Sequence, residues 1–559
     1  MRCLFLFLLL IVIGCKSQQH FQNGFTAKQA MVVSAREEAS KIGADIMKQG
    51  GNAFDAMVAT ELALAVAYPY AGNIGGGGFM VYRQSNGETG SLDYREKAPM
   101  ASTKEMFLDK NKNVIPDLST QTALAVGVPG TIAGIFEVHK KFGTLPIEIL
   151  INPAIALAKK GVVLTEKEFQ KLEAYRQVIV QVNGDKTLYA NKYKIGDTIK
   201  YPAFAETLKR ISKNGKVEFY KGETAQKLID YIRSKGGIMT LDDLEKYKAI
   251  WRKPIRFSYK DITIFSMAPP SSGGICLAQI LKMIEPFDLK KYGHNSEKYI
   301  QILTEAERRS YADRNFYLGD PDFVSIPQSK LLDGNYLKQR MSDFTFEKAT
   351  RSADVQRGNI AFSESDETTH YSIVDPFGNA VSVTTTLNGA YGSKLYCDSL
   401  GFFLNNEMDD FSAKPGTPNS YGLTGSEANS IAPQKRMLSS MTPTIVEKDG
   451  KLFMVLGTPG GSTIITSVLQ TILNVYEFGM PMQRAVDASR FHHQWLPDEI
   501  LFEPNSFSTE LLHNLKSKGY LINENKSPVI GKVDAILIRS DGELEGGADK
   551  RGDDNASGF

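Results

Sequence analysis

Beyond residue 367 the sequence contains three pairs of strand-like segments, and this pattern constrains the fold more than any other feature. The pairs are 369–374 with 380–386, 442–447 with 451–456, and 533–539 with 543–545. Short turns rich in Asp, Gly and Pro join the members of each pair, which is typical of antiparallel hairpins. Helical spacing of apolar residues predicts helices in the region from about 120 to 350, namely 165–182, 203–213, 223–235 and 296–317. Helices that precede and separate hairpins predict an α+β layered fold rather than a doubly wound parallel sheet.

The composition excludes several classes of function. The 559 residues are enough for several domains or for one large multilayer domain. Lys and Arg total 65 and Asp and Glu total 63, so the net charge of +2 gives no electrostatic reason to bind nucleic acid. The sequence has no GxSxG, GxxxxGK[ST], HExxH or CxxC motif. Cys276 and Cys397 are the two cysteines of the expected folded body, and the sequence leaves open whether they pair.

The first fifteen residues resemble a bacterial lipoprotein signal peptide. Arg2 is followed by an apolar run from Leu4 to Ile13, which is too short to span a bilayer, and then by Gly14-Cys15 and a polar segment. On this interpretation Cys15 is the acylated first residue of a periplasmic protein that is lipid-anchored to a bacterial membrane. The alternative is ordinary signal-peptidase cleavage nearby, with Cys15 incidental. No later run of 18 apolar residues occurs, so no transmembrane helix is predicted.

Five short polar stretches have an ordinary interpretation when each is taken alone. They are Thr368-Thr369, Thr384 to Asn388, "NNEMDDF" (405–411), "MLSSMTP" (437–443) and "GTPGGS" (457–462). Threonine is common in strands, acidic clusters are usually solvated, and paired glycines mark turns. "NNEMDDF" also lacks the alternating oxygen ligands and central glycine of a calcium loop.

Together these stretches resemble the motifs of the gamma-glutamyltranspeptidase family. The motifs are "LDYREKAP" (92–99), "TTHYSIVD" (368–375), "NNEMDDFSAKPG" (405–416), "KRMLSSMTPTIV" (435–446), "GTPGGS" (457–462) and "FHHQWLPDE" (491–499), in the order of the family. The resemblance extends from about Ala30 to the C-terminus. It implies a four-layer αββα sandwich, the fold of the N-terminal-nucleophile hydrolases.

The family matures by self-cleavage, which by similarity falls between Glu367 and Thr368. The expected organisation is a signal peptide (1–15), a large subunit (16–367) and a small subunit (368–559), with both subunits forming one shared αββα domain as a heterodimer. Cleavage has a chemical purpose, because a threonine hydroxyl is a weak nucleophile without a base. An α-amino group has a pKa of about 7.7–8.0 and is such a base near neutral pH. Only an N-terminal threonine carries both groups.

The resemblance also assigns roles within the site. Thr386 matches the residue that orients the nucleophile, and the amides of Gly460 and Gly461 match the oxyanion hole. Arg95 matches the arginine that binds the α-carboxylate of the γ-glutamyl group, with Ser439 and Ser440 adding hydrogen bonds. Further matches are Asn388, Glu407 and Asp410 as the groups that hold the α-ammonium, and Tyr421 in the lid loop (415–426). Asp409 is expected to be structural, and no metal or organic cofactor is implied.

These matches predict a gamma-glutamyltransferase and glutathione hydrolase. The γ-glutamyl group of glutathione or a related amide would pass to Thr368 and then to water, an amino acid or a peptide. One alternative is an acylase of the same fold that acts on a glutaryl-type amide such as a cephalosporin side chain. Glu407 and Asp410 argue against this alternative, because such a substrate has no α-amine. A second alternative, a non-catalytic periplasmic binding lipoprotein, conflicts with the intact set of Thr368, Thr386 and the two glycines.

Overall fold

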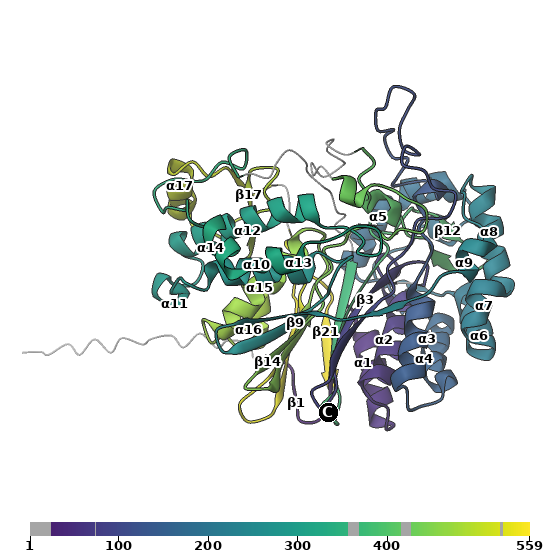
Figure 1. Cartoon of the computed structure of the whole chain (residues 1–559). Coiled ribbons are helices and arrows are strands. Elements are labelled where there is room, and N and C mark those ends of the chain that lie inside the picture. The colour runs from purple at the N-terminus through teal and green to yellow at the C-terminus, as the bar shows by residue number, and fades with distance from the viewer. Residues whose placement is uncertain (1–23, 73, 356–367, 415–425, 526–528) are drawn as a thin grey trace, which may run out of the picture.

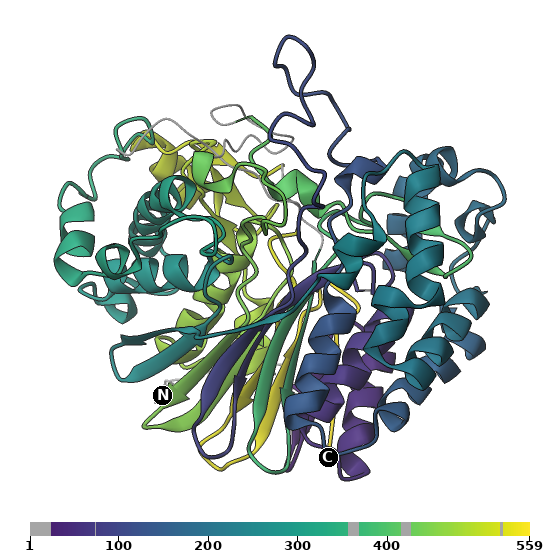
Figure 2. The ribbon, with the colours of Figure 1, turned by 45° about the vertical axis from the view of Figure 1, so that its right-hand side comes forward.

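The fold has four layers, two helical and two of β-sheet. The computed structural model describes residues 24–72, 74–355, 368–414, 426–525 and 529–559. Two antiparallel sheets of seven strands face each other, and helices cover the outer face of each sheet (Figure 1). Turning the molecule by 45° separates the two helical layers on either side of the sheets (Figure 2). The predicted αββα sandwich is therefore confirmed.

The first sheet carries the hairpin that begins at Thr368. Its strands, in spatial order, are β21 (Asn555–Gly558), β2 (Met31–Ser34), β10 (Thr368–Val374), β11 (Ala380–Thr386), β3 (Gly77–Arg83), β4 (Thr89–Asp93) and β7 (Ile250–Arg252). The central hairpin is thus flanked by strands from the part of the chain that precedes residue 367. Both predicted strands of the hairpin are present, and the structure extends the first of them to include Thr368.

The second sheet also mixes strands from the two parts of the chain. Its order is β1 (Thr26–Ala27), β20 (Leu544–Ala548), β19 (Asp534–Ile538), β15 (Lys451–Gly457), β14 (Thr444–Lys448), β9 (Ile262–Ser266) and β8 (Ile255–Tyr259). The other two predicted hairpins, β14–β15 and β19–β20, lie side by side in this sheet.

Three apolar cores hold the layers together. One packs α1 (Glu37–Lys48), α2 (Ala53–Ala67), α3 (Thr131–Phe142) and α4 (Ile147–Lys160) on the first sheet. Another packs α10 (Gly273–Ile284), α12 (Glu297–Tyr317) and α15 (Thr463–Tyr476) on the second sheet. The third core lies between the sheets and includes Val81 and Val455. Burial of apolar surface on both faces of each sheet favours this layered arrangement.

The turn of the β10–β11 hairpin fixes its register. Asp375 Oδ1 accepts the backbone N–H of Phe377 at 2.9 Å and that of Asn379 at 2.8 Å, and Gly378 adopts φ 87°. This turn pairs Val374 with Ala380, and the pairing continues without a shift along both strands. The register at the turn therefore determines which residues meet at the opposite end of the hairpin.

The region from 120 to 350 differs from its predicted helical character in the strands that it contains, among them the short pair β5 (Val162–Val163) and β6 (Thr198–Ile199). It contains the expected helices, including α5 (Glu166–Asn183), α6 (Pro202–Asn214), α8 (Glu223–Ser234) and α12, but also the strands β7, β8 and β9. These strands occupy sheet edges or pair with β14, where tertiary contacts rather than local periodicity define them. Cys276 and Cys397 are both buried and free, so they do not pair. No helix in the described ranges is long and apolar enough to cross a membrane.

Candidate active site

Thr368 and Thr386 meet at the open end of the β10–β11 hairpin. They are direct partners in the antiparallel register, and Thr368 Oγ1 donates to Thr386 Oγ1 at 3.4 Å. Thr386 Oγ1 also accepts the backbone N–H of Asn388 at 2.7 Å, which fixes the direction of its side chain. The hairpin thus places one hydroxyl beside the predicted nucleophile.

One pocket gathers nine of the residues that the sequence singled out. Its lining comes from β10 and β11 of the first sheet, from loops next to strands of both sheets and from the start of α15, namely Arg95, Thr368, Thr386, Asn388, Glu407, Asp410, Ser439, Ser440 and Gly461, together with Met441 and Ile464. Gly460 directly precedes the lining residue Gly461. Asp409 is not part of the lining and accepts a hydrogen bond from Ser119 Oγ at 2.5 Å.

The guanidinium of Arg95 lies between two carboxylates of this pocket. Its Nη1 lies 2.6 Å from Glu407 Oε2, and its Nη2 forms an ion pair with Asp410. The side chain is 1% exposed, and its backbone N–H donates to Asp93 Oδ1 at 3.0 Å just after β4. The residue predicted to bind a carboxylate is therefore paired with two of the three residues predicted to bind an ammonium. Mutual pairing avoids the cost of leaving these buried charges without partners.

Asn405 positions the loop that carries these two carboxylates. Its Oδ1 accepts the backbone N–H groups of Glu407 at 3.1 Å and Gly127 at 2.9 Å. Its Nδ2 donates to the carbonyl of Gly75 at 2.7 Å, in the glycine run before β3. The short 3-10 helix Glu407–Asp410 follows directly, so the loop is tied to the first sheet.

Asn388 contributes an acceptor to the pocket. Its backbone adopts φ 72°, a left-handed conformation that asparagine tolerates better than most residues. Its Nδ2 donates to the carbonyl of Asn406 at 3.0 Å, which orients the amide. The amide oxygen is then the end of this side chain that can accept from a bound ammonium.

Ser439 and Ser440 enter the pocket from the segment before β14. Ser439 Oγ accepts the backbone N–H of Met441 at 3.1 Å, and Ser440 Oγ accepts from Arg314 Nη2 at 2.9 Å. Arg314 lies near the C-terminal end of α12 and is buried. Nothing in the sequence distinguishes Arg314 from the other charged residues of this predicted helix, because charged residues in a helix usually lie on a solvated face.

Gly460 and Gly461 connect β15 to α15. Their φ angles are 132° and 55°, which a residue with a side chain rarely adopts. A Cβ atom at Gly460 would lie 2.5 Å from Thr463 Oγ1, which itself donates to the carbonyl of Gly460 at 2.7 Å. Gly461 reaches the pocket just before α15, and the backbone N–H groups at a helix N-terminus favour negative charge.

Two titratable groups beside the pocket are held uncharged by burial. Burial raises the pKa of Glu96 to about 8, an effect that the nearby Arg95 guanidinium opposes. Glu96 Oε2 lies 3.9 Å from Arg95 Nη1. Burial also lowers the pKa of His370 to about 3. His370 Nδ1 lies 2.9 Å from Thr384 Oγ1 and its Nε2 lies 3.1 Å from Ser372 Oγ, so both ring nitrogens have structural partners.

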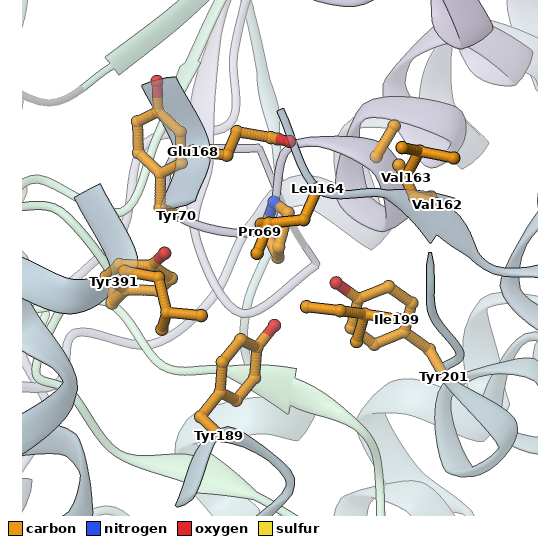
Figure 3. A pocket seen from close by; sticks show the side chains of 12 residues that line it. Pro69, Tyr70, Val162, Val163, Leu164, Glu168, Tyr189, Ile199, Tyr201 and Tyr391 are labelled. Carbon is orange, nitrogen blue, oxygen red and sulfur yellow. The ribbon is translucent and has the colours of Figure 1, made fainter. Parts of the chain in front are cut away.

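A second pocket contains none of the predicted site residues that line the pocket of Thr368. Figure 3 shows side chains that line it, among them Tyr70, Tyr189, Tyr201 and Tyr391, on a largely apolar wall. Glu168 at its edge forms an ion pair with Arg36. This pocket shares no lining residue with the pocket of Thr368. Within the described ranges, no group of three or more His, Cys, Asp or Glu side chains is arranged to hold a metal ion.

Three predicted positions fall outside the described residues. They are Glu367 at the expected cleavage site, Tyr421 in the expected lid and Cys15 at the expected lipid anchor. Their roles remain predictions.

Comparison with known proteins agrees with the motifs. The family model described as Gamma-glutamyltranspeptidase matches residues 39–559. The chain is 45% identical over 538 residues to a glutathione hydrolase proenzyme of Escherichia coli, covering 95% of this chain and 92% of that protein. It is 46% identical over 529 residues to a glutathione hydrolase proenzyme of Pseudomonas aeruginosa, covering 93% of each.

The fold has close structural relatives as well. The crystal structure of a cephalosporin acylase from Bacillus halodurans superposes with a TM-score of 0.85 at 24% identity, covering 98% of this chain and 99% of that one. Identity at this level shows a shared fold and no more. The family match, by contrast, covers nearly the whole chain and includes every motif that lines the pocket of Thr368. The chain therefore belongs to the gamma-glutamyltranspeptidase family.

Proposed function

We propose that this protein is a self-processing gamma-glutamyltransferase and glutathione hydrolase. The observation that carries the proposal is the shared pocket of Thr368 and the Arg95–Glu407–Asp410 cluster. A γ-glutamyl group has an α-carboxylate and an α-ammonium at one end and a reactive carbonyl at the other. The cluster offers a partner for each charge, and Thr368 offers the nucleophile.

The zwitterionic end of a γ-glutamyl group suits the Arg95–Glu407–Asp410 cluster, whose positive and negative side chains form ion pairs with each other. The bound α-carboxylate takes the place of the acidic side chains on Arg95, and the α-ammonium takes the place of Arg95 on Glu407 and Asp410. Charge is balanced before and after binding, so no buried charge loses its partner. The planar guanidinium can hold both carboxylate oxygens.

Self-cleavage begins at the same hydroxyl. Thr368 Oγ1 attacks the carbonyl carbon of Glu367, the peptide C–N bond breaks, and the nitrogen becomes the α-amino group of Thr368. Water then hydrolyses the resulting ester, which frees the carboxyl group of Glu367 and restores the hydroxyl. Thr386 supports this role because its fixed hydroxyl accepts from Thr368.

Catalysis by the mature protein repeats the attack on a substrate. The α-amino group of Thr368 takes the hydroxyl proton while Oγ1 attacks the γ-carbonyl carbon. The amide C–N bond breaks, and the proton passes to the departing amine, which leaves a γ-glutamyl ester on Thr368. Water or the amine of an acceptor then attacks this ester and releases glutamate or a new γ-glutamyl compound. The backbone N–H groups of Gly460 and Gly461 would stabilise the oxyanion of each tetrahedral intermediate.

The acylase alternative is less well supported. A glutaryl group would bring a carboxylate to Arg95 and no ammonium to Glu407 and Asp410. Two buried carboxylates would then lose their cation, which disfavours that substrate. The cephalosporin acylase relative shares the fold at an identity too low to argue for its substrate.

The assembly follows from the strand order. Each sheet contains strands from before and from after residue 367 that pair with each other, so the two products of cleavage would remain one αββα domain. This arrangement supports a heterodimer of residues 16–367 and 368–559. The N-terminal motif supports export and lipid attachment at Cys15, with a periplasmic location.

The direct test is turnover of glutathione by the purified protein, with and without a dipeptide acceptor. Release of glutamate alone indicates hydrolysis, and formation of a γ-glutamyl dipeptide indicates transfer. A protein that turned over glutaryl amides but not glutathione would favour the acylase instead.

A further inference from the structure

We propose that Arg314 is a positioning residue for the donor α-carboxylate, acting through Ser440 and Ser439. This inference rests on the proposed function of the pocket and adds a residue to it. Arg314 belongs to α12, far in sequence from the motifs of the site, and it is 2% exposed. It does not line the pocket of Thr368, so any effect on substrate must pass through its neighbours.

The three arms of the guanidinium have separate acceptors. Nη2 donates to Ser440 Oγ at 2.9 Å, Nε donates to Ser272 Oγ at 2.8 Å, and Nη1 donates to Asn315 Oδ1 at 3.2 Å. Each of these contacts is buried. The fork geometry of arginine therefore ties α12 to the serine pair from behind the pocket.

The direction of the first hydrogen bond determines where the Ser440 hydroxyl points. A guanidinium has only donors, so Ser440 Oγ accepts from Arg314. The single hydrogen of Ser440 is then available for another acceptor, and no hydrogen bond within the described part of the chain uses it. Because Ser440 lines the pocket, this hydrogen can be donated to an anion bound there.

The hydroxyl oxygen of Ser439, like that of Ser440, accepts a hydrogen bond from the protein. Its Oγ accepts the backbone N–H of Met441 at 3.1 Å, so its hydroxyl hydrogen is likewise directed away from the protein backbone. The hydroxyls of Ser439 and Ser440 both accept a hydrogen bond from the protein and can both donate one to a carboxylate in the pocket. An amide donor fixes Ser439, and a charged donor fixes Ser440.

Arg314 also holds the backbone of the serine pair, through Ser272. Ser272 Oγ accepts from Arg314 and donates to the carbonyl of Ser439 at 2.8 Å, while the Ser272 backbone N–H reaches the same carbonyl at 2.7 Å. One guanidinium therefore contacts Ser440 directly and Ser439 through one intermediate. After cleavage between Glu367 and Thr368, these contacts would join the large subunit to the small one.

The positive charge of Arg314 adds to the effect. A hydrogen bond from a charged donor polarises the accepting hydroxyl, which makes that hydroxyl a stronger donor in turn. The donor strength of Ser440 toward a carboxylate thus depends on both the position and the charge of Arg314. Loss of Arg314 should weaken binding of the α-carboxylate and leave the chemistry at Thr368 intact.

The test compares Arg314→Gln and Arg314→Lys in the self-cleaved protein that retains both subunits. Each substitution is made in the parent background and in the Ser440→Ala background. The KM for a γ-glutamyl donor should rise about tenfold in Arg314→Gln, with a smaller rise in Arg314→Lys and little change in kcat. In the Ser440→Ala background the additional rise caused by Arg314→Gln should largely disappear. A 4-aminobutyryl amide, which lacks the α-carboxylate, should show no difference between parent and variants.

Arg309→Lys is a matched control for disturbance of α12. Arg309 lies on the same helix, is 1% exposed and pairs with Glu305 and Asp343 rather than with the serine pair. Its variant should leave the donor KM unchanged. An equal rise of KM with Ser440 and with Ser440→Ala, or an unchanged KM in Arg314→Gln, would overturn the inference.

Binding of L-glutamate, measured by calorimetry, separates this inference from the proposed function. If the parent neither binds L-glutamate nor turns over γ-glutamyl donors, the proposed function fails and this inference fails with it. If the parent does both and Arg314→Gln matches it in each, only the role of Arg314 is wrong.

Discussion

Arg95 Nη1 and Glu407 Oε2 form a buried ion pair of 2.6 Å in the pocket that also contains Thr368. By resemblance, Arg95 and Glu407 are assigned to the two opposite charges of one zwitterion, the α-carboxylate and the α-ammonium. Their mutual pairing, together with that of Arg95 and Asp410, offsets the cost of burying one cation and two carboxylates. It also defines what a substrate must supply to replace them.

Replacement of Arg95 tests this arrangement. Arg95→Gln should raise the KM for γ-glutamyl donors about a hundredfold. The buried carboxylates of Glu407 and Asp410 lose their cation, and the substrate α-carboxylate loses the guanidinium that would bind both of its oxygens. Self-cleavage should persist, since Arg95 is assigned to donor binding and not to attack by Thr368. Steady-state kinetics and a denaturing gel measure the two effects separately. Arg36→Lys is the control, because Arg36 is buried and pairs with Glu38 and Glu168 outside the pocket. Unchanged donor kinetics in Arg95→Gln would refute the assignment.

A methyl group at Gly460 should damage the chemical step. In Gly460→Ala the new Cβ meets Thr463 Oγ1, and alanine disfavours a φ of 132°. Displacement of this segment should lower kcat about 10²–10³-fold, the range seen when an oxyanion donor is lost. Gly479→Ala is the control, because Gly479 also has a positive φ, at the other end of α15, and a Cβ there meets nothing within 4 Å. Equal kcat values for the two variants would argue against an oxyanion role.

The stability of the protein should depend on the protonation of Glu96. Burial raises the pKa of Glu96 from 4.5 to about 8, so the folded protein keeps a proton that the unfolded chain loses. The free energy of unfolding therefore falls as the pH rises from about 4.5 to about 8. Glu96→Gln has no proton to lose and should show a smaller fall over this range in thermal unfolding. The exposed Glu510→Gln should behave as the parent does, and a parent-like pH dependence in Glu96→Gln would contradict the argument.

The proposed lipid attachment requires the thiol of Cys15. In a bacterial host the parent should fractionate with membranes and carry an acylated cysteine at the mature N-terminus. Cys15→Ala should lose both properties while the gamma-glutamyl activity of the exported fraction is kept. Mass spectrometry of the N-terminal peptide measures the modification directly. A parent protein that is cleaved elsewhere and lacks acyl groups would support ordinary signal-peptidase processing.

The hairpins could be predicted from the sequence because local signals define them. Turn residues and alternation placed residues 369–374 and 380–386 opposite each other, and the structure pairs Val374 with Ala380 as those bounds require. The β8–β9 hairpin was not predicted, because it lies within a helix-rich region. Pairing of β9 with β14 places it in the sheet, and that partner is distant in the chain.

The residues of the pocket also fall into two groups, those whose positions local motifs predict and those that only the tertiary fold brings together. Thr368, Thr386 and the two glycines lie at the ends of predictable elements, so their positions followed from the motifs. The pairing of Arg95 with Glu407 depends on loops that only the complete fold brings together. The sequence does not indicate that Arg314 is buried near the site. The many charged residues of α12 are typical of a surface helix, whereas the structure buries most of the helix.

The identity of the nucleophile is tested most directly by intact-mass analysis of the purified protein before and after incubation with glutathione. We expect two polypeptides, the smaller one beginning at Thr368, and a transient γ-glutamyl adduct on its first residue. The Thr368→Ala variant should remain a single chain without an adduct. A parent protein that stayed full-length, or whose smaller polypeptide began at another residue, would rule out Thr368 as the N-terminal nucleophile.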